Sequence, residues 1–232
     1  MKKVIKVAFK ITIPVMLGYL SVGIAFGLLL EKSGYNFLWA IIMSLFIYAG
    51  SMQFIAIGLL TGGAGLISIA LMTLFVNIRH VFYGLSFIDK FKAMGKKRIY
   101  MIFSLTDETY SLLCFAKTPE GVDKNSFLFY IAFLDQIYWL IGTIIGSIAG
   151  SLITFNTKGM DFAMTALFVV IFIEQWFTYK NHIPVIIGVI VTILSLLIFG
   201  PNNMILPSMV FITIILMLFK KQIDTEVIKY EC

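Results

Sequence analysis

Charged residues are scarce in this chain: they make up only 13% of its 232 residues, whereas 60% are hydrophobic. A soluble domain of this length could not bury so much apolar surface, so the composition excludes that class and predicts a polytopic membrane protein. The net charge of +6 does not indicate nucleic-acid binding. The lysines gather at the ends of hydrophobic segments, where they set the orientation in the membrane.

Cysteine is nearly absent, and the motifs of known enzymes are missing. Cys114 and Cys232 are the only cysteines, and their spacing indicates neither a disulfide nor a metal site. The sequence lacks an HExxH motif, a nucleophile elbow and a phosphate-binding loop, and it leaves no room for a soluble catalytic domain. We therefore expect no enzyme activity, no cofactor and no bound metal.

Hydrophobic runs are abundant, and they predict an all-α helical bundle in the inner or plasma membrane, with residues 1–232 as a single integral membrane domain. A spanning helix needs about 20 apolar residues, and about six to eight segments approach that length. These segments lie at 7–30, 37–60, 66–88, 99–116, 127–155, 160–178, 183–199 and 204–219, before a tail at 220–232. Glycines spaced four residues apart predict close helix packing in two of the segments. They are Gly23 and Gly27, and Gly142, Gly146 and Gly150.

The positions of the lysines constrain the topology. The N-terminus and the loop at 90–98 are both rich in lysine, so both should face the cytoplasm. Three full crossings between them would leave the loop outside. The conflict disappears if segment 37–60 is broken or re-entrant around 48–54, and a matching element is expected around 135–142. Both termini are then cytoplasmic, and a plain bundle of seven or eight spans is the alternative.

The few charged residues are informative because several lie inside lipid-length segments. Arg79 and His80 lie in segment 66–88, Asp107 and Glu108 in segment 99–116, and Asp135 in segment 127–155. A charge near the centre of a bilayer costs roughly 2.5–3.5 kcal/mol, so it usually has a function. This pattern is typical of a transporter.

Residues 77–84 combine a cation with a titratable group. Arg79 and Tyr83 share one face of a helix, and Asn77 and His80 share a neighbouring face. The guanidinium is a planar fork of donors suited to a carboxylate, and the imidazole could carry a proton near neutral pH. The alternative is that Arg79 snorkels to the cytoplasmic surface.

The acidic residues supply candidate partners for a cation. Asp107 and Glu108 are adjacent, so they point to different faces, and one could pair with Arg79 while the other binds an ammonium group or carries a proton. A purely structural Arg–Asp pair is the alternative. Asp135 faces the same way as Trp139 on a helix, which fits a site or a position near the lipid headgroups.

The segment 48–54 supplies small and polar residues. Such residues would let a helix open and free its backbone groups for a polar ligand, with Ser51 and Gln53 adding hydrogen bonds. The alternative is a packed, kinked helix in which Ser51 bonds its own backbone.

Four blocks of this sequence together resemble the AzlC-type family of branched-chain amino acid exporters, the large subunit of a two-subunit permease. They are Ala49-Gly50-Ser51-Met52-Gln53-Phe54, Asn77-Ile78-Arg79-His80-Val81-Phe82-Tyr83-Gly84, Thr106-Asp107-Glu108 and Asp135-Gln136-Ile137-Tyr138-Trp139. The resemblance extends over about Lys6 to Phe219. It implies efflux of leucine, isoleucine, valine and related hydrophobic amino acids, with a small membrane partner of the AzlD type.

An amino acid substrate would use the charges named above. Arg79 would bind its carboxylate, and Asp107, Glu108 or Asp135 would bind its ammonium group. The full set of proposed substrate contacts is Ser51, Gln53, Asn77, Arg79, Tyr83, Asp107 and Asp135, and the proposed proton or ion carriers are His80, Asp107 and Glu108. No nucleotide-binding motif is present, so an ion gradient is the expected energy source. The alternatives are a permease for another small zwitterion or organic solute, and a structural membrane subunit that does not transport.

Overall fold

The computed structural model describes residues 2–152, 182–201 and 204–219, together with 169, 172–173 and 176–177. Across these residues the regular secondary structure is helical, with no β-strand, which confirms the predicted all-α class. The chain divides into two compact units, Met1–Ala163 and Met164–Cys232. Most of the predicted segment 160–178 and the tail 220–232 lie outside the described residues. The single domain 1–232 stays a prediction.

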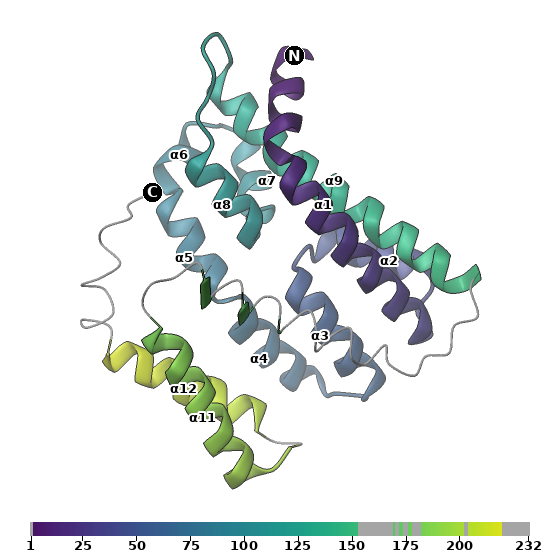
Figure 1. The fold of residues 1–232 in the computed structure, drawn as a ribbon, viewed down its shortest axis with the longest axis vertical. Helices are drawn as coiled ribbons and strands as arrows, with labels where there is room; N and C mark the ends of the chain where they lie inside the picture. The colour runs from purple at the N-terminus through teal and green to yellow at the C-terminus, as the bar shows by residue number, and fades with distance from the viewer. Residues whose placement is uncertain are drawn as a thin grey trace. The chain divides into compact units, whose positions relative to one another are not determined.

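Two long helices, α1 (Lys2–Lys32) and α9 (Lys124–Leu152), pack side by side in the first unit (Figure 1). They contain 31 and 29 residues, so each is roughly 45 Å long and exceeds the hydrocarbon core of a bilayer, which is about 30 Å thick. Both are apolar enough to cross a membrane, and the bent pair α4 (Leu66–Asn77) and α5 (Arg79–Ser86) would make a third span.

Helix α9 runs without interruption through residues 135–142, so the broken element predicted there is wrong. The polar residues that suggested a break find partners on neighbouring helices. Thr109 Oγ1 donates to Asp135 Oδ2 at 2.9 Å, and Tyr100 OH donates to Gln136 Oε1 at 2.7 Å. Because Asp135 and Gln136 bond to partners outside α9, they do not compete for its backbone hydrogen bonds, and the helix continues.

The predicted glycine stripes lie at the contact between α1 and α9. A Cβ atom on Gly27 would collide with the backbone of Thr143, and one on Gly146 would collide with the backbone of Ile24. Gly23 and Gly142 lie in the same contact and face backbone atoms of the opposite helix. The two backbones meet directly, as small residues allow in lipid.

The remaining helices of the first unit are short, with at most 12 residues each. They are α2 (Phe37–Phe46), α3 (Gly50–Thr61), α4 (Leu66–Asn77), α5 (Arg79–Ser86), α6 (Ile88–Lys92), α7 (Lys97–Phe103) and α8 (Asp107–Phe115). Twelve helical residues extend only about 18 Å, so each of these helices is too short to cross alone. The break predicted around 48–54 is confirmed and lies at 47–49, whereas the breaks at 78 and 104–106 were not predicted.

Several polar side chains point inward, and many large apolar side chains point outward, which suits a lipid environment. Buried hydroxyls bond between helices: Ser44 Oγ lies 2.9 Å from Thr143 Oγ1, and Thr12 Oγ1 lies 3.0 Å from Tyr138 OH. Large apolar side chains on the outside are strongly exposed; among them are Leu17, Phe46, Leu66, Ile67, Phe82 and Leu152.

A hydrophobic core forms where α6, α7 and α8 meet α1 and α9. Its fully or almost fully buried members include Ala8, Phe87, Phe91, Met101, Leu113, Phe127 and Ile131. This core fixes the position of α8, whose first turn carries the adjacent residues Asp107 and Glu108.

In the second unit, α11 (Ile183–Phe199) and α12 (Ile205–Leu218) pack against each other as a helical hairpin. The rings of Phe199 and Phe211 stack with their centroids 6.4 Å apart. These helices agree closely with the predicted segments 183–199 and 204–219.

The glycine contact can be tested with one substitution and a control on the same helix. Gly27→Ala should destabilise the folded chain by about 1–3 kcal/mol, the usual range for overpacking, because the added methyl meets the backbone of α9. Thermal unfolding in detergent would measure the loss. Gly18→Ala is the control, because a Cβ atom there has open space around it. Equal stability of the two variants would contradict the close contact.

Candidate functional site

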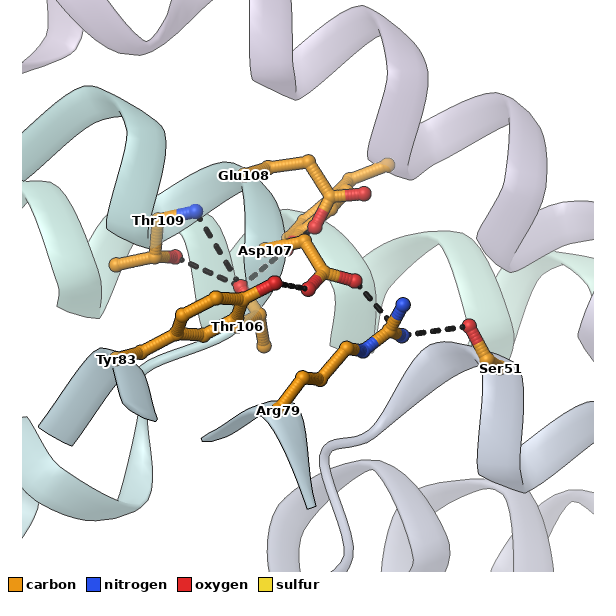
Figure 2. A network of polar contacts seen from close by, with 8 residues as sticks. Ser51, Arg79, Tyr83, Thr106, Asp107, Glu108 and Thr109 are labelled. Carbon is orange, nitrogen blue, oxygen red and sulfur yellow. Dashed lines mark hydrogen bonds and ion pairs between the residues drawn. The ribbon is translucent and has the colours of Figure 1, made fainter. Parts of the chain in front are cut away.

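An ion pair lies at the centre of the polar residues in the first unit (Figure 2). Arg79 Nη2 is 2.8 Å from Asp107 Oδ2 and donates to Ser51 Oγ at 3.2 Å. Tyr83 OH donates to Asp107 Oδ1 at 2.7 Å. The predicted residues Ser51, Arg79, Tyr83 and Asp107 are therefore in direct contact, and Arg79 is paired within the chain.

Three helices begin at this ion pair. Ser51 is the second residue of α3, Arg79 is the first of α5 and Asp107 is the first of α8. The start of a helix carries N–H groups without helical partners and a partial positive charge. An arginine at this position adds its positive charge to that of the helix starts. The site therefore attracts anions. Asp107 is the anion that satisfies it in this structure.

The break at 47–49 is held by a glycine and a tryptophan. Tyr48 has a left-handed backbone (φ 43°), and its N–H donates to Met43 O at 3.1 Å. A Cβ atom on Gly50 would lie 3.2 Å from the ring of Trp139. Trp139 Nε1 also donates to Gln53 Oε1 at 3.1 Å. Trp139 of α9 therefore fixes the position of the beginning of α3. Gln53 is hydrogen-bonded to α9 and not to Arg79.

The break at 78 separates two of the predicted residues. Helices α4 and α5 meet there at a bend of 42°, so Asn77 and His80 lie on different helices, and the shared face expected for them stays a prediction. Arg79 and Tyr83 do share a face of α5 and reach the same carboxylate. The ring of His80 lies edge-on to Tyr83, with centroids 5.7 Å apart.

The two adjacent acids point to different partners, as expected. Asp107 faces α5, whereas Glu108 Oε2 accepts a hydrogen bond from Tyr19 OH at 2.8 Å. Thr106 caps α8, since its side chain accepts a hydrogen bond from the Thr109 N–H at 3.4 Å. The cap fixes the directions in which the two carboxylates leave the helix.

Asp135 lies deeper than the ion pair. It is 0% exposed, and Oδ2 accepts the hydrogen bond from Thr109. Its second oxygen, Oδ1, is buried and has no hydrogen-bond partner within the described part of the chain. The structure therefore connects Asp135 to the first turn of α8 and not directly to Arg79.

Sequence reasoning missed three hydroxyl residues of the site. Tyr19 lies in an apolar run, where an aromatic residue usually packs, and nothing in its surroundings indicates a polar role. Thr106 and Thr109 flank the acid pair, and a threonine before two acids is a recognisable helix-start signal. That signal was available in the sequence.

Comparison with known proteins finds relatives over nearly the whole chain. The family described as AzlC protein matches residues 14–153. The chain is 43% identical over 217 residues to the Branched-chain amino acid transport protein AzlC of Bacillus subtilis, covering 94% of this chain and 85% of that protein. It is 42% identical over 222 residues to an uncharacterized membrane protein of Helicobacter pylori, covering 96% and 97%.

A more distant relative is the inner membrane protein YgaZ of Escherichia coli, 32% identical over 149 residues, which cover 61% of this chain and 59% of that protein. No solved structure matches the chain. The names of these relatives, together with the apolar helices α1 and α9, support a location in the membrane.

The ion pair can be tested with a double-mutant cycle. Arg79→Gln and Asp107→Asn should each destabilise the chain, and the double variant should lose less than the sum, with a coupling of about 0.5–3 kcal/mol, as for contacting residues. Unfolding in detergent would measure it. The exposed pair Lys92–Asp89, with nitrogen and oxygen 3.5 Å apart, is the control and should give no resolvable coupling. Additive losses at Arg79 and Asp107 would refute the pairing.

Proposed function

Because this chain belongs to the AzlC family, we propose that it exports branched-chain and related hydrophobic amino acids as the large subunit of a two-subunit permease driven by an ion gradient. The family relationship supports membrane transport and does not point to an enzyme class. The observation that carries the proposal is the Arg79–Asp107 pair at the start of three helices.

A zwitterion suits this pair because it carries both complementary charges. An amino acid carboxylate would take the place of Asp107 on the Arg79 guanidinium. The Asp107 carboxylate, released from Arg79, would then bind the substrate ammonium group. One ion pair becomes two, so no unpaired charge is left in the membrane, where such a charge is costly.

The guanidinium has capacity for an incoming carboxylate. Arg79 Nε is buried and has no hydrogen-bond partner among the described residues, while about a third of the side chain, 33%, is exposed. Helix starts at the ends of broken membrane helices are common partners for the anionic group of a substrate. Here the first turn of α3, with Ser51, would add its N–H groups.

Other proposed contacts are buried polar groups that a ligand could satisfy. Gln53 Nε2 and Asn77 Oδ1 are buried, and neither has a hydrogen-bond partner in the ranges that the structure describes. We keep both as substrate contacts, with Tyr83 orienting Asp107. Asp135 is the remaining proposed contact.

Two parts of the proposal rest on the family resemblance and on energetics. A small AzlD-type membrane subunit would complete the permease. The energy for export would come from a proton or other ion gradient, with His80, Asp107 or Glu108 as carriers.

The site is tested by leucine efflux from preloaded vesicles that contain this chain and the small subunit. Arg79→Lys keeps the charge and loses the planar fork. We expect efflux to fall by roughly tenfold or more, because a hydrogen bond to a charged group is worth about 1.5–3 kcal/mol. Arg98→Lys, an exposed arginine outside the site, is the matched control. Normal efflux through Arg79→Lys at equal abundance would refute the carboxylate role, and no leucine efflux in the wild type would refute the substrate.

The energy source is tested separately by adding a protonophore to vesicles that export leucine against its gradient. We expect uphill efflux to stop while exchange of leucine across the membrane continues, because exchange needs no net ion movement. Uphill efflux that survives collapse of the proton gradient would exclude proton coupling.

A further inference from the structure

A chain of three hydroxyl groups joins the carboxyl groups of Glu108 and Asp135. We infer that these two residues hold one shared proton through Tyr19, Thr106 and Thr109, and that this pair is the proton-binding site of the transporter. The inference rests on the proposed function, because it assigns the ion coupling of that transport to named residues.

The contacts run in an unbroken series from α8 to α1, back to the start of α8, and from there to α9. Glu108 Oε2 is 2.8 Å from Tyr19 OH, which is 2.6 Å from Thr106 Oγ1. Thr106 Oγ1 is 3.0 Å from Thr109 Oγ1, which is 2.9 Å from Asp135 Oδ2. All four distances are within the range of O–H···O hydrogen bonds.

Counting protons shows what this series requires. Three hydroxyl groups bring three protons, and the series has four oxygen–oxygen contacts. Each contact needs one proton between its oxygens, because two oxygens this close without one repel each other. The fourth proton must come from a carboxyl group, so one of Glu108 and Asp135 is protonated and donates to its hydroxyl neighbour, while the other is ionised and accepts.

The two arrangements interconvert without any atom leaving the series. When Glu108 gives its proton to Tyr19, Tyr19 passes its own proton to Thr106, and Thr106 passes its own to Thr109. Thr109 then gives its proton to Asp135, which becomes the protonated acid. One proton has been transferred in effect, and the negative charge has moved from Asp135 to Glu108.

The two ends of the series have different surroundings. Asp135 is 0% exposed, and the titratable groups that face it are four tyrosines and one acid: Tyr19, Tyr48, Tyr100, Tyr138 and Glu108. The tyrosines are neutral hydroxyls and Glu108 is another acid, so none of these groups offers Asp135 a positive charge. A buried carboxyl group without a charge partner favours its neutral form. The shared proton is therefore stored on Asp135.

Glu108 is the end that responds to the substrate. It is exposed, and it follows Asp107 in the first turn of α8. The charged groups that face it are Arg79, Asp107 and, at the other end of the series, Asp135. A substrate ammonium group at Asp107 would favour the ionised form of Glu108. The shared proton would then be held more strongly on Asp135, so occupation of the ion pair and the location of the proton are linked.

Infrared difference spectroscopy of the purified chain in lipid tests the shared proton without any transport. We expect one buried protonated carboxyl group near neutral pH. Asp135→Asn and Glu108→Gln should each abolish its band, because either amide supplies the missing donor and leaves the other carboxyl ionised. Asp89→Asn, at an exposed side chain, should leave the band unchanged. No such band in the wild type, or a band that survives either of these two substitutions, would overturn the inference.

Transport measurements test the role of the relay. Tyr19→Phe and Thr109→Val interrupt the series and keep both carboxyl groups, so the ratio of proton-driven efflux to exchange should fall by roughly 10²-fold, the lower end of what a positioned proton-transfer group contributes. Tyr35→Phe and Thr61→Val, outside the relay, are the matched controls. An unchanged ratio in Tyr19→Phe and Thr109→Val would overturn the relay while the proposed transport stands. Absence of leucine transport in the wild type would instead remove the proposed function.

Discussion

The direct contact between the backbones of α1 and α9 is the interaction on which the rest of the site depends. It brings Tyr19 on α1 beside Trp139 on α9, with the two rings 5.5 Å apart in an edge-to-face arrangement. Trp139 in turn packs against Gly50 and bonds to Gln53 at the start of α3, while Tyr19 reaches Glu108 on α8. A larger separation of α1 and α9 would move all of these partners apart.

Broken helices are the means by which this apolar chain brings polar groups to one point. An open helix end in a membrane is tolerated only where the protein satisfies it. Here the Thr106 side chain caps the first turn of α8. At the first turns of α3 and α5, Ser51 accepts a hydrogen bond from Arg79, and Arg79 pairs with Asp107. The positive helix starts repel the guanidinium and attract the carboxylate. Asp107 therefore stabilises both the cation and the helix ends around it.

Most of this fold could be predicted where the signal is local. The all-α class follows from long apolar runs, and the contact at Gly27 and Gly146 follows from the spacing of small residues. The break at 47–49 follows from small and polar residues in a membrane-length segment. In each case neighbouring residues in the sequence contain the physical cause.

The failures arose where the outcome depends on residues far away in the sequence. Asp135 and Gln136 in an apolar helix are compatible with a break or with side-chain partners. Thr109 and Tyr100 decide between these outcomes, and nothing local to α9 identifies them. The hydroxyl of Tyr19 was missed for the same reason, because its polar role exists only once α8 lies beside α1.

In the proposed scheme the amino acid and the proton bind to different pairs of charged residues. Arg79 and Asp107 cancel each other, and a zwitterion that inserts between them adds no net charge. Glu108 and Asp135 with one shared proton carry a single negative charge, which a second proton would remove. Rearrangement within a membrane is easiest for a neutral site, because a buried unpaired charge opposes it. Protonation would therefore control when the site can change its exposure, and the amino acid would control where the shared proton resides.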